Sequence, residues 1–587
     1  LSAAPVRSLE KKGFVRIDTS SFLRDPTARR NILPTRPLTL TSEQASALEL
    51  IVDCIDSAAP AGTDGAGPST VLLHGVTGSG KTEVYLQAIA HVRHKGCGAI
   101  VLVPEISLTP QTVERFVARF GDDIAVLHSH LSDGERHDEW HRIRSGQARI
   151  VVGARPPVFA PIEKPGLIVV DEEHEPSYKQ DEAPRYHARD VAVVRAHLEN
   201  ATVVLGSATP SLESYHNCKV GKYRLSELTS RVDNRRMPHM EVVDMRAEAA
   251  MRGGAQIFSR RLESLIRDRL ENGAQTILFL NRRGYATQMM CTKCGYVASC
   301  EDCSVTYTYH RERQQLTCHL CGRVLPAPLV CPQCEDPEIR YTGLGTEKVE
   351  AVARRLFPRA AIARMDSDTM TRKNAHKKTL LAFRSGRIQI LIGTQMIAKG
   401  LDFPNVTLVG VIFADLGLHL PDFRSGERTF QLLTQVAGRA GRGDRAGRVV
   451  VQTYTPFHPA LECAMETNYK GFYEEEMASR AALAFPPATH MAIVHFRGPD
   501  EARTARCAET VAEKLKERLQ NLEDRVTVVG PMPAPIARIR KLFRYQLLLR
   551  GGRITHVAAV VRSMVVGRQL FGKDVEVYVD VDPQSLL

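Results

Sequence analysis

No segment of this chain is long enough and apolar enough to cross a bilayer as a helix. Such a helix needs about 18 to 20 consecutive apolar residues, and the 587 residues contain no run of that kind. The first residues also lack the basic start, apolar centre and small-residue cleavage site of a secretory signal. We therefore expect a cytoplasmic protein that has no membrane partner.

Internal repeats and long low-complexity tracts are also missing. The chain is 43% hydrophobic, so we expect a globular protein, and its length allows three or four domains that each bury a core. Acidic residues are fewer than basic residues, 66 against 78, which gives a net charge of +12. This excess favours a polyanionic partner such as nucleic acid, although many basic proteins bind none.

Cysteine is scarce, and most of it lies in one place. Of 13 cysteines, eight form four Cys-x-x-Cys pairs within 44 residues: Cys291/Cys294, Cys300/Cys303, Cys318/Cys321 and Cys331/Cys334. A two-residue gap lets both thiolates of a pair face one ion, and two pairs complete a tetrahedron around zinc. The pairs therefore predict two Zn²⁺ ions. A redox role is the alternative, and the absence of a thioredoxin-like context argues against it.

The spacing of the pairs indicates how they share the two ions. Fourteen residues separate Cys303 from Cys318, close to the roughly 15 to 20 of a two-pair zinc site. Only five separate Cys294 from Cys300, which is short for folding two pairs around one ion. We predict a nested arrangement with an outer set for zinc 1 and an inner set for zinc 2. The outer set is Cys291, Cys294, Cys331 and Cys334, and the inner set is Cys300, Cys303, Cys318 and Cys321.

Apolar strand-like runs alternate with amphipathic helical stretches over most of the chain, which predicts parallel α/β sheets. The first set of runs is 71–74, 99–103, 149–152, 167–170 and 202–205, and the second is 276–280, 388–392, 406–412 and 448–452. We therefore predict the α/β class, with two tandem parallel-sheet domains. The two-zinc cysteine-rich insertion splits the second domain.

A break at Phe485-Pro486-Pro487 precedes a smaller unit. Its predicted elements follow the order strand, helix, strand, strand, helix, strand, at 491–496, 501–522, 526–529, 545–549, 554–566 and 575–581. This order is the split βαβ pattern of ferredoxin-like domains. We expect a small α+β C-terminal domain.

A glycine-rich segment follows the strand at 71–74 and opens a predicted helix. It reads Gly75-Val76-Thr77-Gly78-Ser79-Gly80-Lys81-Thr82, in the context that a phosphate-binding loop requires. Backbone N–H groups of such a loop close around phosphates, while Lys81 would reach the β and γ oxygens and Thr82 would coordinate Mg²⁺. A chance Gly-rich turn is the alternative. We predict a nucleoside-triphosphate site with Mg²⁺.

Two acidic residues end the strand at 167–170, where parallel sheets bind their ligands. Asp171 would hold Mg²⁺ through water, and Glu172 would orient or deprotonate the attacking water. An acidic cluster after a strand is by itself usually a solvated turn. The neighbouring phosphate-loop motif favours the catalytic interpretation.

Two further motifs suit a motor. Ser207 and Thr209 follow the strand at 202–205 and would couple the nucleotide site to motion through their hydroxyls. Arg439 and Arg442 lie about one helical turn apart, so they would reach a triphosphate from the second α/β domain. A basic helix terminus is the alternative for this arginine pair.

Aromatic and basic residues alternate soon after the carboxylates, at Tyr178, Lys179, Arg185 and Tyr186. Single-stranded DNA is bound by such a mixture, because bases stack on rings at roughly 1 to 3 kcal/mol each and cations contact phosphates. A plain surface loop is the competing interpretation.

A second basic cluster lies in the last domain, where Arg538, Arg540, Lys541 and Arg544 could follow a DNA backbone. An ordinary solvated basic face explains it nearly as well. Histidines at 128, 130, 137 and 141 invite a metal hypothesis, but the charged residues around them favour an exposed helix.

The motifs resemble those of superfamily 2 helicases, and over essentially the whole chain they resemble the PriA family, the bacterial primosomal (primosomal protein N-prime) replication-restart helicases. The segments that carry the resemblance are Val103-Pro104-Glu105-Ile106-Ser107-Leu108-Thr109, Asp171-Glu172-Glu173-His174-Glu175, Asn281-Arg282-Arg283-Gly284-Tyr285, Gly393-Thr394-Gln395-Met396-Ile397-Ala398-Lys399-Gly400 and Leu416-Gly417 with Arg424-Ser425-Gly426-Glu427-Arg428. The eight cysteines occupy that family's position between motor blocks.

This resemblance implies two RecA-like motor domains and an ATP-dependent 3′-to-5′ DNA helicase. Such a helicase would recognise stalled or abandoned replication forks and initiate primosome assembly for replication restart. The residues implied to carry ATP hydrolysis are Lys81, Thr82, Asp171, Glu172, Arg439 and Arg442. Gln44 would contact adenine, and Gly400 and Asp402 would link nucleotide and DNA.

The partners implied are forked and single-stranded DNA, single-stranded DNA-binding protein, other primosome proteins and a helicase loader. The chain would act as a monomer in the bacterial cytoplasm. A catalytically silent fork-binding scaffold and the motor of another DNA-processing system are the alternatives. The intact catalytic residues argue against the scaffold, and the cysteine array argues against the other motor.

The domain division that follows has six parts. They are 1–37, a remnant of a winged-helix domain and linker; 38–234, helicase lobe 1; 235–287 and 341–455, the two parts of lobe 2; 288–340, the zinc insertion; and 456–587, a ferredoxin-like DNA-binding domain. One segment departs from the family pattern, since Ala154-Arg155-Pro156-Pro157 stands where Thr-Arg-Ser-Ala is usual. Its prolines remove backbone donors and argue against a DNA-backbone contact.

Overall fold

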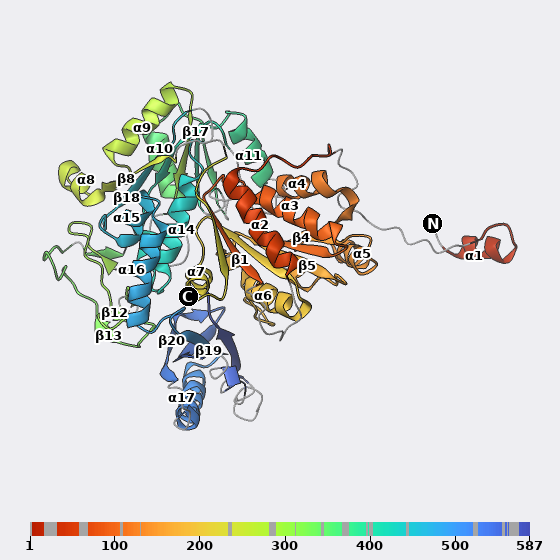
Figure 1. Cartoon of the computed structure of the whole chain (residues 1–587). Coiled ribbons are helices and arrows are strands. Elements are labelled where there is room, and N and C mark those ends of the chain that lie inside the picture. Colours follow the sequence, from red (N-terminus) through yellow and green to blue (C-terminus); the bar gives the residue numbers. More distant parts are fainter. Residues whose placement is uncertain are drawn as a thin grey trace.

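The computed structural model describes residues 3–16, 32–57, 69–105, 110–129, 131–232, 237–280, 289–303, 305–310, 313–337, 339–341, 345–366, 375–394, 397, 403–441, 445–519, 526–553, 558–559, 562 and 574–586. Two α/β lobes lie side by side, and a smaller domain lies against both near the C-terminus (Figure 1). Helix α1 (Ala3–Lys11) stands apart from them. Among the helices within these ranges, none is long and apolar enough to cross a membrane.

The first lobe is a parallel sheet with helices on both faces. Within the described residues its strand order is β3-β4-β2-β5-β6-β1-β7. The strands are β1 (Thr70–Gly75), β2 (Gly98–Leu102), β3 (Ile124–Leu127), β4 (Ile150–Gly153), β5 (Pro165–Asp171), β6 (Thr202–Ser207) and β7 (Arg224–Leu228). The helices are α2 (Ser42–Asp56), α3 (Lys81–His94), α4 (Pro110–Phe120), α5 (Asp133–Arg144), α6 (Ala188–Glu199) and α7 (Leu212–Lys219). Because both faces are covered, the central strands are apolar throughout.

The second lobe has the same construction. Its parallel strands, as far as the chain is described, follow the order β15-β16-β9-β17-β18-β8. They are β8 (His239–Asp244), β9 (Gln275–Phe279), β15 (Ile362–Met365), β16 (Ile390–Gly393), β17 (Val406–Val411) and β18 (Arg448–Thr453). The helices are α8 (Met245–Arg252), α9 (Arg260–Glu271), α10 (Thr346–Leu356), α11 (Ala375–Arg384), α13 (Asp415–Leu418) and α14 (Ser425–Ala437).

The cysteine-rich insertion leaves this lobe after β9 and returns before α10. Its short strands are β10 (Met289–Met290), β11 (Thr308–His310), β12 (Gln315–Thr317), β13 (Val324–Pro326) and β14 (Arg340–Tyr341). At the base of the insertion β10 pairs with β14, with Met289 opposite Tyr341. The chain therefore enters and leaves the insertion at one point, which lets it interrupt the lobe without breaking the sheet.

The C-terminal domain is an antiparallel sheet with the order β20-β21-β19-β22. Its elements are β19 (His490–Gly498), α17 (Glu501–Leu519), β20 (Thr527–Ile539), β21 (Leu542–Gly551) and β22 (Glu576–Val581). The first and third strands lie at the centre, as the split βαβ pattern requires. Most of the second predicted helix, at 554–566, lies outside the described residues. The predicted class, two parallel-sheet domains with a zinc insertion and a small α+β domain, is confirmed.

Two helices that the sequence division placed in the C-terminal domain pack elsewhere. They are α15 (Pro459–Met465) and α16 (Tyr469–Ala482). Helix α15 packs on α14 and β8 of the second lobe, and apolar side chains of both helices join a core shared with that lobe. The antiparallel sheet therefore begins at β19, after these helices have completed the second lobe.

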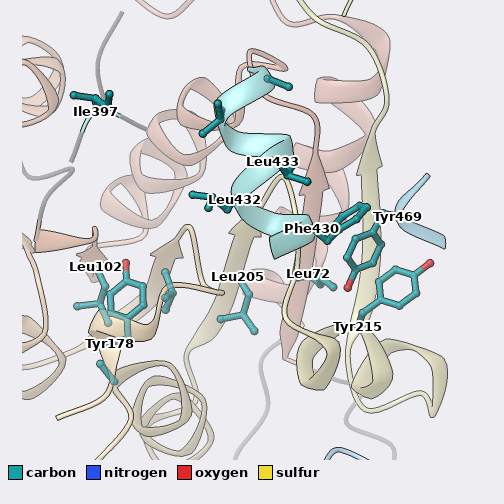
Figure 2. Packing of buried hydrophobic residues seen from close by; sticks show 14 of the residues in the cluster. Leu72, Leu102, Tyr178, Leu205, Tyr215, Ile397, Phe430, Leu432, Leu433 and Tyr469 are labelled. Carbon is teal, nitrogen blue, oxygen red and sulfur yellow. The ribbon is translucent and has the colours of Figure 1, made fainter. Parts of the chain in front are cut away.

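One apolar core runs through both lobes. Figure 2 shows Leu72 and Leu205 from the first lobe close to Phe430 of α14. Tyr469 of α16 contacts Tyr215 of α7 edge-on at a centroid distance of 5.0 Å and donates its hydroxyl to Pro210 O at 2.9 Å. Such aromatic pairs stabilise contacts beyond the area that they bury. The lobes therefore meet in a packed interface on the side of α7 and α16.

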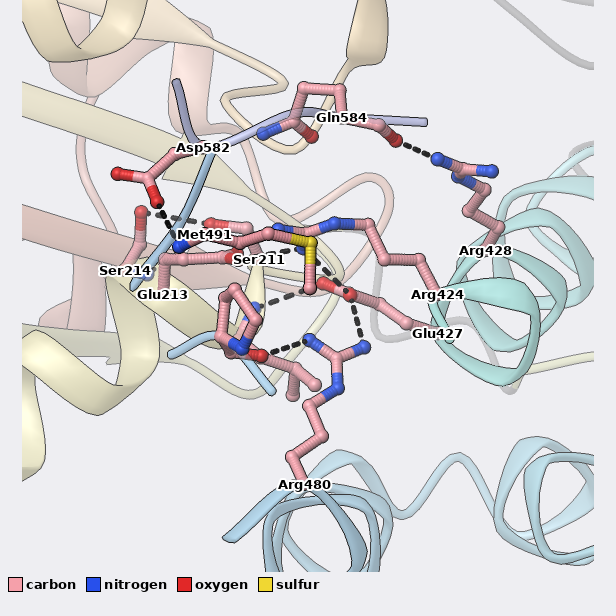
Figure 3. A network of polar contacts seen from close by, with 12 residues as sticks. Ser211, Glu213, Ser214, Arg424, Glu427, Arg428, Arg480, Met491, Asp582 and Gln584 are labelled. Atoms are coloured by element: carbon pink, nitrogen blue, oxygen red, sulfur yellow. Dashed lines mark hydrogen bonds and ion pairs between the residues drawn. The ribbon is translucent and has the colours of Figure 1, made fainter. Parts of the chain in front are cut away.

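A buried ionic network reinforces this interface (Figure 3). Glu427 of α14 accepts hydrogen bonds from the backbone N–H of Leu212 at 3.0 Å and from Arg480 of α16 at 2.8 Å. Arg424 pairs with Glu213 of the first lobe at 2.6 Å. Burial raises the pKa of Glu213, but Arg424 and neighbouring arginines outweigh it and lower that pKa to about 2. Glu213 is therefore charged at neutral pH, and these contacts of Glu213 and Glu427 hold the lobes together.

We expect Glu427→Ala to destabilise the protein strongly. The substitution leaves the guanidinium of Arg480, which is 1% exposed, and the N–H of Leu212 buried without this partner. Breaking one side of a buried ion pair costs about 3 to 5 kcal/mol. Differential scanning calorimetry should show a melting temperature several degrees lower. Glu475→Ala, at an exposed position of α16, serves as the control, and equal melting temperatures for the two variants would contradict this account.

Candidate active site and its zinc-bearing insertion

The glycine-rich segment forms the turn expected between β1 and α3. Gly78 and Gly80 have φ of +86° and +80°, a region that glycine adopts at no steric cost. Lys81 donates its ammonium to Gly75 O at 2.6 Å. The first residues of α3, Lys81 to Glu83, line the cavity beside the loop, and the N-terminus of a helix is a favourable site for phosphate.

Gln44 braces this loop. Its Nε2 donates to Ser79 O at 2.8 Å, while its Oε1 accepts from the N–H of Thr41 at 2.9 Å. The side chain is only 4% exposed. The resemblance assigns Gln44 to adenine, and that role stays a prediction; in this structure its side-chain amide contacts the phosphate loop. The capping residue of α2 thus also braces this loop.

A cavity of about 580 Å³ opens beside the loop. Thr77 to Glu83 form one wall, Asp171 and Glu172 another, and Arg439 reaches it from the second lobe. Hydroxyl and carboxylate oxygens are ligands for Mg²⁺, and backbone N–H groups donate hydrogen bonds to phosphates. The residues present therefore fit ATP with Mg²⁺.

Asp171 and Glu172 occupy the carboxyl end of β5, as predicted. Burial and the nearby charge of Glu172 raise the pKa of Asp171 to about 6, against the opposing effect of Lys81. Glu172 has a φ of +47°, which is uncommon for a residue with a side chain and is typical of strained functional positions. Closely spaced carboxylates of this kind are stabilised when a divalent cation binds.

The second lobe closes against the phosphate loop. A Cβ added to Gly438 would lie 2.8 Å from Thr77 Cγ2, so only glycine allows this approach. Arg439, the next residue, lines the cavity, where the sequence placed it. Arg442, Gly400 and Asp402, which the sequence also assigned to catalysis or coupling, lie outside the described residues.

A histidine that was given no role joins the two lobes beside the catalytic strand. Gln435 of α14 donates its side-chain amide to His174 Nε2 at 2.6 Å, so the opposite nitrogen, Nδ1, carries the proton and donates to Ser207 Oγ at 2.7 Å. Ser207 Oγ also accepts from the N–H of Thr209 at 2.9 Å. Ser207 is thus linked through His174 to the second lobe, and the coupling role of Ser207 and Thr209 stays a prediction. His174 and Gln435 could be found only from the motifs that contain them.

The segment predicted to stack on DNA is folded against the protein. Tyr178 is 1% exposed and donates its hydroxyl to Asp171 O at 2.6 Å. Figure 2 shows its ring within the apolar core. Tyr186 packs edge-on against Phe159 at 5.0 Å. The structure therefore corrects the view of Tyr178 as a free stacking platform, because its ring supports the catalytic strand.

The basic residues of that segment contact the C-terminal domain. Lys179 pairs with Asp580 at 2.6 Å and donates to Val581 O at 2.8 Å. Arg185 lies over the ring of Tyr578, 3.9 Å from its centroid. The two basic residues of this segment thus find their partners within the chain, on strand β22. Sequence spacing alone could not reveal this partner, since it lies some 400 residues away.

A second cavity, of about 700 Å³, lies where the two lobes and the C-terminal domain meet. Its basic lining residues are Arg155, Lys179, Arg185, Arg428 and Arg544. His495 also lines it, and burial with the nearby charges of Arg544 and Arg185 lowers the pKa of this histidine to about 3. His495 therefore adds no positive charge at neutral pH, and the arginines and Lys179 share the lining with the carboxylates of Glu105, Glu175, Asp181 and Asp580.

The other predicted basic residues of the C-terminal domain lie at a hairpin. Arg540 and Lys541 form its two-residue turn, both with positive φ, and Arg538 is exposed on the preceding strand. Positive φ at both positions is the mark of a type I′ turn, which matches the strand twist. These side chains extend into solvent at the tip of β20 and β21, while Arg544 faces the three-domain cavity.

The cysteines form the two nested sets predicted. One set is Cys291, Cys294, Cys331 and Cys334, and the other is Cys300, Cys303, Cys318 and Cys321, with all four sulfurs of each within 4.8 Å of one another. Sulfurs of Cys291 and Cys334 are 3.7 Å apart, and those of Cys300 and Cys321 are 3.6 Å apart. Zn–S bonds of about 2.3 Å in a tetrahedron require roughly 3.8 Å between sulfurs. Each set therefore fits one zinc ion.

The inner zinc set is built into the surface that meets the C-terminal domain. Cys300, Cys303 and Cys318 share an apolar cluster with Met491 and Leu548 of that domain. His319, next to a ligand, contacts Pro533 O at 3.1 Å, and its own carbonyl accepts from Gln546 at 3.2 Å. Zinc at this set would therefore order a domain interface as well as the insertion.

Four family models match the chain. They are "DEAD/DEAH box helicase" over residues 53–218, "Helicase conserved C-terminal domain" over 344–444, "PriA DNA helicase Cys-rich region (CRR) domain" over 300–326 and "Primosomal protein N C-terminal domain" over 481–584. Together they cover parts of both lobes, the inner zinc set and the antiparallel sheet.

Several known proteins are similar to the chain along its whole length. The replication restart protein PriA of Bacillus subtilis is 47% identical over 588 residues, which cover 100% of this chain and 72% of that protein. The proteins of the same name from Synechocystis and Haemophilus influenzae are 41% and 40% identical, over 100% of this chain and 69% and 78% of theirs.

The nested zinc sets predict the metal content of double variants. Cys294→Ser with Cys331→Ser should lower the zinc content from two ions to one, because both residues belong to the outer set. Cys294→Ser with Cys300→Ser should lower it to none. Inductively coupled plasma mass spectrometry of the purified proteins gives the content, and Cys97→Ser, outside both sets, should retain two ions. Loss of both ions in the first double variant would contradict the nested sets.

Proposed function

The chain belongs to the replication restart protein PriA family and is a replication-restart DNA helicase, and we propose that it is driven by ATP hydrolysis. In this proposal it moves 3′ to 5′ on DNA, recognises stalled or abandoned forks and initiates primosome assembly. The cavity between the phosphate loop and Arg439 is the observation that supports ATP dependence, since both lobes contribute to it.

Five residues of this cavity have roles in the proposed reaction. Lys81 and the first N–H groups of α3 would hold the phosphates, while Thr82 and Asp171 would hold Mg²⁺. Glu172 would orient and deprotonate the attacking water. Arg439 would stabilise charge on the transferred phosphoryl group, which makes hydrolysis depend on lobe closure. Bound ATP would supply the free energy for movement.

Lobe movement would follow from the contact of α14 with the catalytic strand. Because Gln435 and His174 hydrogen-bond across the lobes, a change at Glu172 or Arg439 alters the position of α14. The loop that contains Tyr178 and Lys179 connects the catalytic strand to strand β22, because Tyr178 bonds Asp171 and Lys179 bonds the C-terminal domain. Through these contacts the nucleotide site would act on the three-domain cavity.

We assign single-stranded DNA to the three-domain cavity, where its phosphates would meet the arginines. Arg155, Arg185, Arg428 and Arg544 line it from three domains, and guanidinium groups bind phosphates in pairs of hydrogen bonds. The prolines after Arg155 start a short 3-10 helix (Pro156–Phe159), which leaves the arginine side chain as the contact group. Forked DNA, single-stranded DNA-binding protein, other primosome proteins and a helicase loader are the partners that the family suggests for a monomer of this chain.

Glu172→Gln should abolish DNA-stimulated hydrolysis. Loss of a general base lowers a rate by roughly 10²- to 10⁴-fold, and glutamine retains the size of the side chain. Phosphate release in the presence of forked DNA measures the effect. Glu182→Gln, at an exposed position of the same lobe, should retain full activity. Absence of hydrolysis by the unaltered protein would favour a silent fork-binding scaffold.

Arg155→Ala and Arg544→Ala should each weaken binding of single-stranded DNA. Removing one phosphate contact should also reduce the slope of log affinity against log salt concentration by about 0.7. Fluorescence anisotropy at several salt concentrations measures both quantities. Arg359→Ala, exposed on the second lobe, is the control for net charge. Salt slopes equal to that of the control would show that these arginines of the cavity do not contact DNA phosphates.

A further inference from the structure

Tyr85 lies directly beneath the candidate nucleotide site. It belongs to the first turn and a half of α3, four residues after Lys81, and its side chain is 1% exposed. Its ring lines the cavity that contains the phosphate loop, Asp171 and Glu172. A buried tyrosine needs a partner for its hydroxyl, and the identity of that partner gives Tyr85 a role.

The partner is the carboxylate that would face magnesium. Tyr85 donates its hydroxyl to Asp171 Oδ1 at 3.1 Å. Burial and the charges of Asp171 and Glu172 raise the pKa of Tyr85 well above 10, so this hydroxyl keeps its proton and acts as a donor. Tyr178 donates to the backbone carbonyl of the same residue at 2.6 Å. Asp171 is therefore fixed at both its side chain and its backbone.

The neighbouring strand leaves room for this hydroxyl. Gly206 on β6 pairs with Asp171 on β5, and a Cβ on Gly206 would lie 1.6 Å from the Tyr85 oxygen. No side chain can occupy that space while the hydrogen bond exists. Gly206 also accepts from the N–H of Glu173 at 3.0 Å. The glycine that opens the Ser207–Thr209 motif thus has a steric task that its sequence position does not reveal.

Asp171 needs such a donor. Its carboxylate is held close to Glu172, and burial removes it from water, so an unsupported side chain would rotate or take up a proton. The ammonium of Lys81 is directed to Gly75 O. A neutral donor on α3 supports the negative charge without competing with a cation for the same carboxylate. It also ties that carboxylate to the helix that begins at the phosphate loop.

We propose that Tyr85 is a positioning residue for the reaction, whose hydroxyl orients the Asp171 carboxylate toward magnesium and joins the phosphate-loop helix to the catalytic strand. Gly206 provides the space for that hydroxyl. This inference rests on the proposed binding of ATP with Mg²⁺.

The test is Tyr85→Phe, which removes the hydroxyl and keeps the ring. A hydrogen bond to a charged group is worth enough to change an equilibrium by about tenfold or more. We therefore expect the concentration of Mg²⁺ that half-saturates ADP binding to rise about tenfold, with ADP affinity in EDTA unchanged. Isothermal titration calorimetry with ADP measures both. DNA-stimulated turnover should fall in kcat and recover partly at high Mg²⁺.

Tyr215→Phe is the matched control. Tyr215 is also 1% exposed, and its hydroxyl has no hydrogen-bond partner among the described residues. Its replacement should leave the Mg²⁺ dependence unchanged. If Tyr85→Phe behaves like this control while the unaltered protein binds ADP with Mg²⁺, the positioning role is overturned. If the unaltered protein shows no Mg²⁺-dependent binding, the proposed function itself fails.

Gly206→Ala provides an independent variant. Its methyl group would displace the Tyr85 hydroxyl, so it should reproduce the higher Mg²⁺ requirement. In the double variant with Tyr85→Phe, Gly206→Ala should raise the Mg²⁺ requirement by less than it does alone, because both substitutions remove the same interaction. Full additivity, measured by the same calorimetry, would overturn the link between the two residues.

Discussion

Helix α14 is the element on which the catalytic geometry depends. Near its start, the buried carboxylate of Glu427 binds the first lobe and Arg480. Two turns later Gln435 donates to His174, and just beyond its end Arg439 enters the nucleotide cavity. One helix thus fixes the lobe interface, the contact of Gln435 with His174 and the position of Arg439. The buried carboxylate of Glu427 can hold α14 in place, because a shift of this carboxylate would leave its buried partners without an ion pair, which costs several kcal/mol of stability, about 3 to 5.

The C-terminal domain is tied to this machinery at several points. Strand β22 holds Lys179 and Tyr578 holds Arg185, both on the loop that follows the catalytic strand. The same domain also packs against the inner zinc set. Zinc, the antiparallel sheet and the catalytic strand therefore form one continuous series of contacts. The insertion thus acts as a structural support between the second lobe and the last domain.

The nucleotide site illustrates how much the local sequence can specify. The phosphate loop, the two carboxylates and the Ser207–Thr209 motif each follow a predicted strand of one parallel sheet, and the carboxyl ends of such strands gather at one edge. The meeting of the phosphate loop and the carboxylates at one cavity was therefore predictable, and so was the place of the Ser207–Thr209 motif beside them, where Gly206 pairs with Asp171. The nested cysteine sets were predictable for a similar reason, since chain length between pairs restricts which pairs can share an ion.

What the sequence determined by itself was thus the chemistry carried by short spacings: the phosphate loop, the carboxylates, the arginine and the zinc ligands. The tertiary structure decided which side chains support them. It set Gln44 against the phosphate loop, buried Tyr178, bound Lys179 to β22 and set Tyr85 against Asp171 beside Gly206. Those contacts join residues tens to hundreds of positions apart. Only packing of separate elements brings them within hydrogen-bond distance, and local spacing carries no information about it.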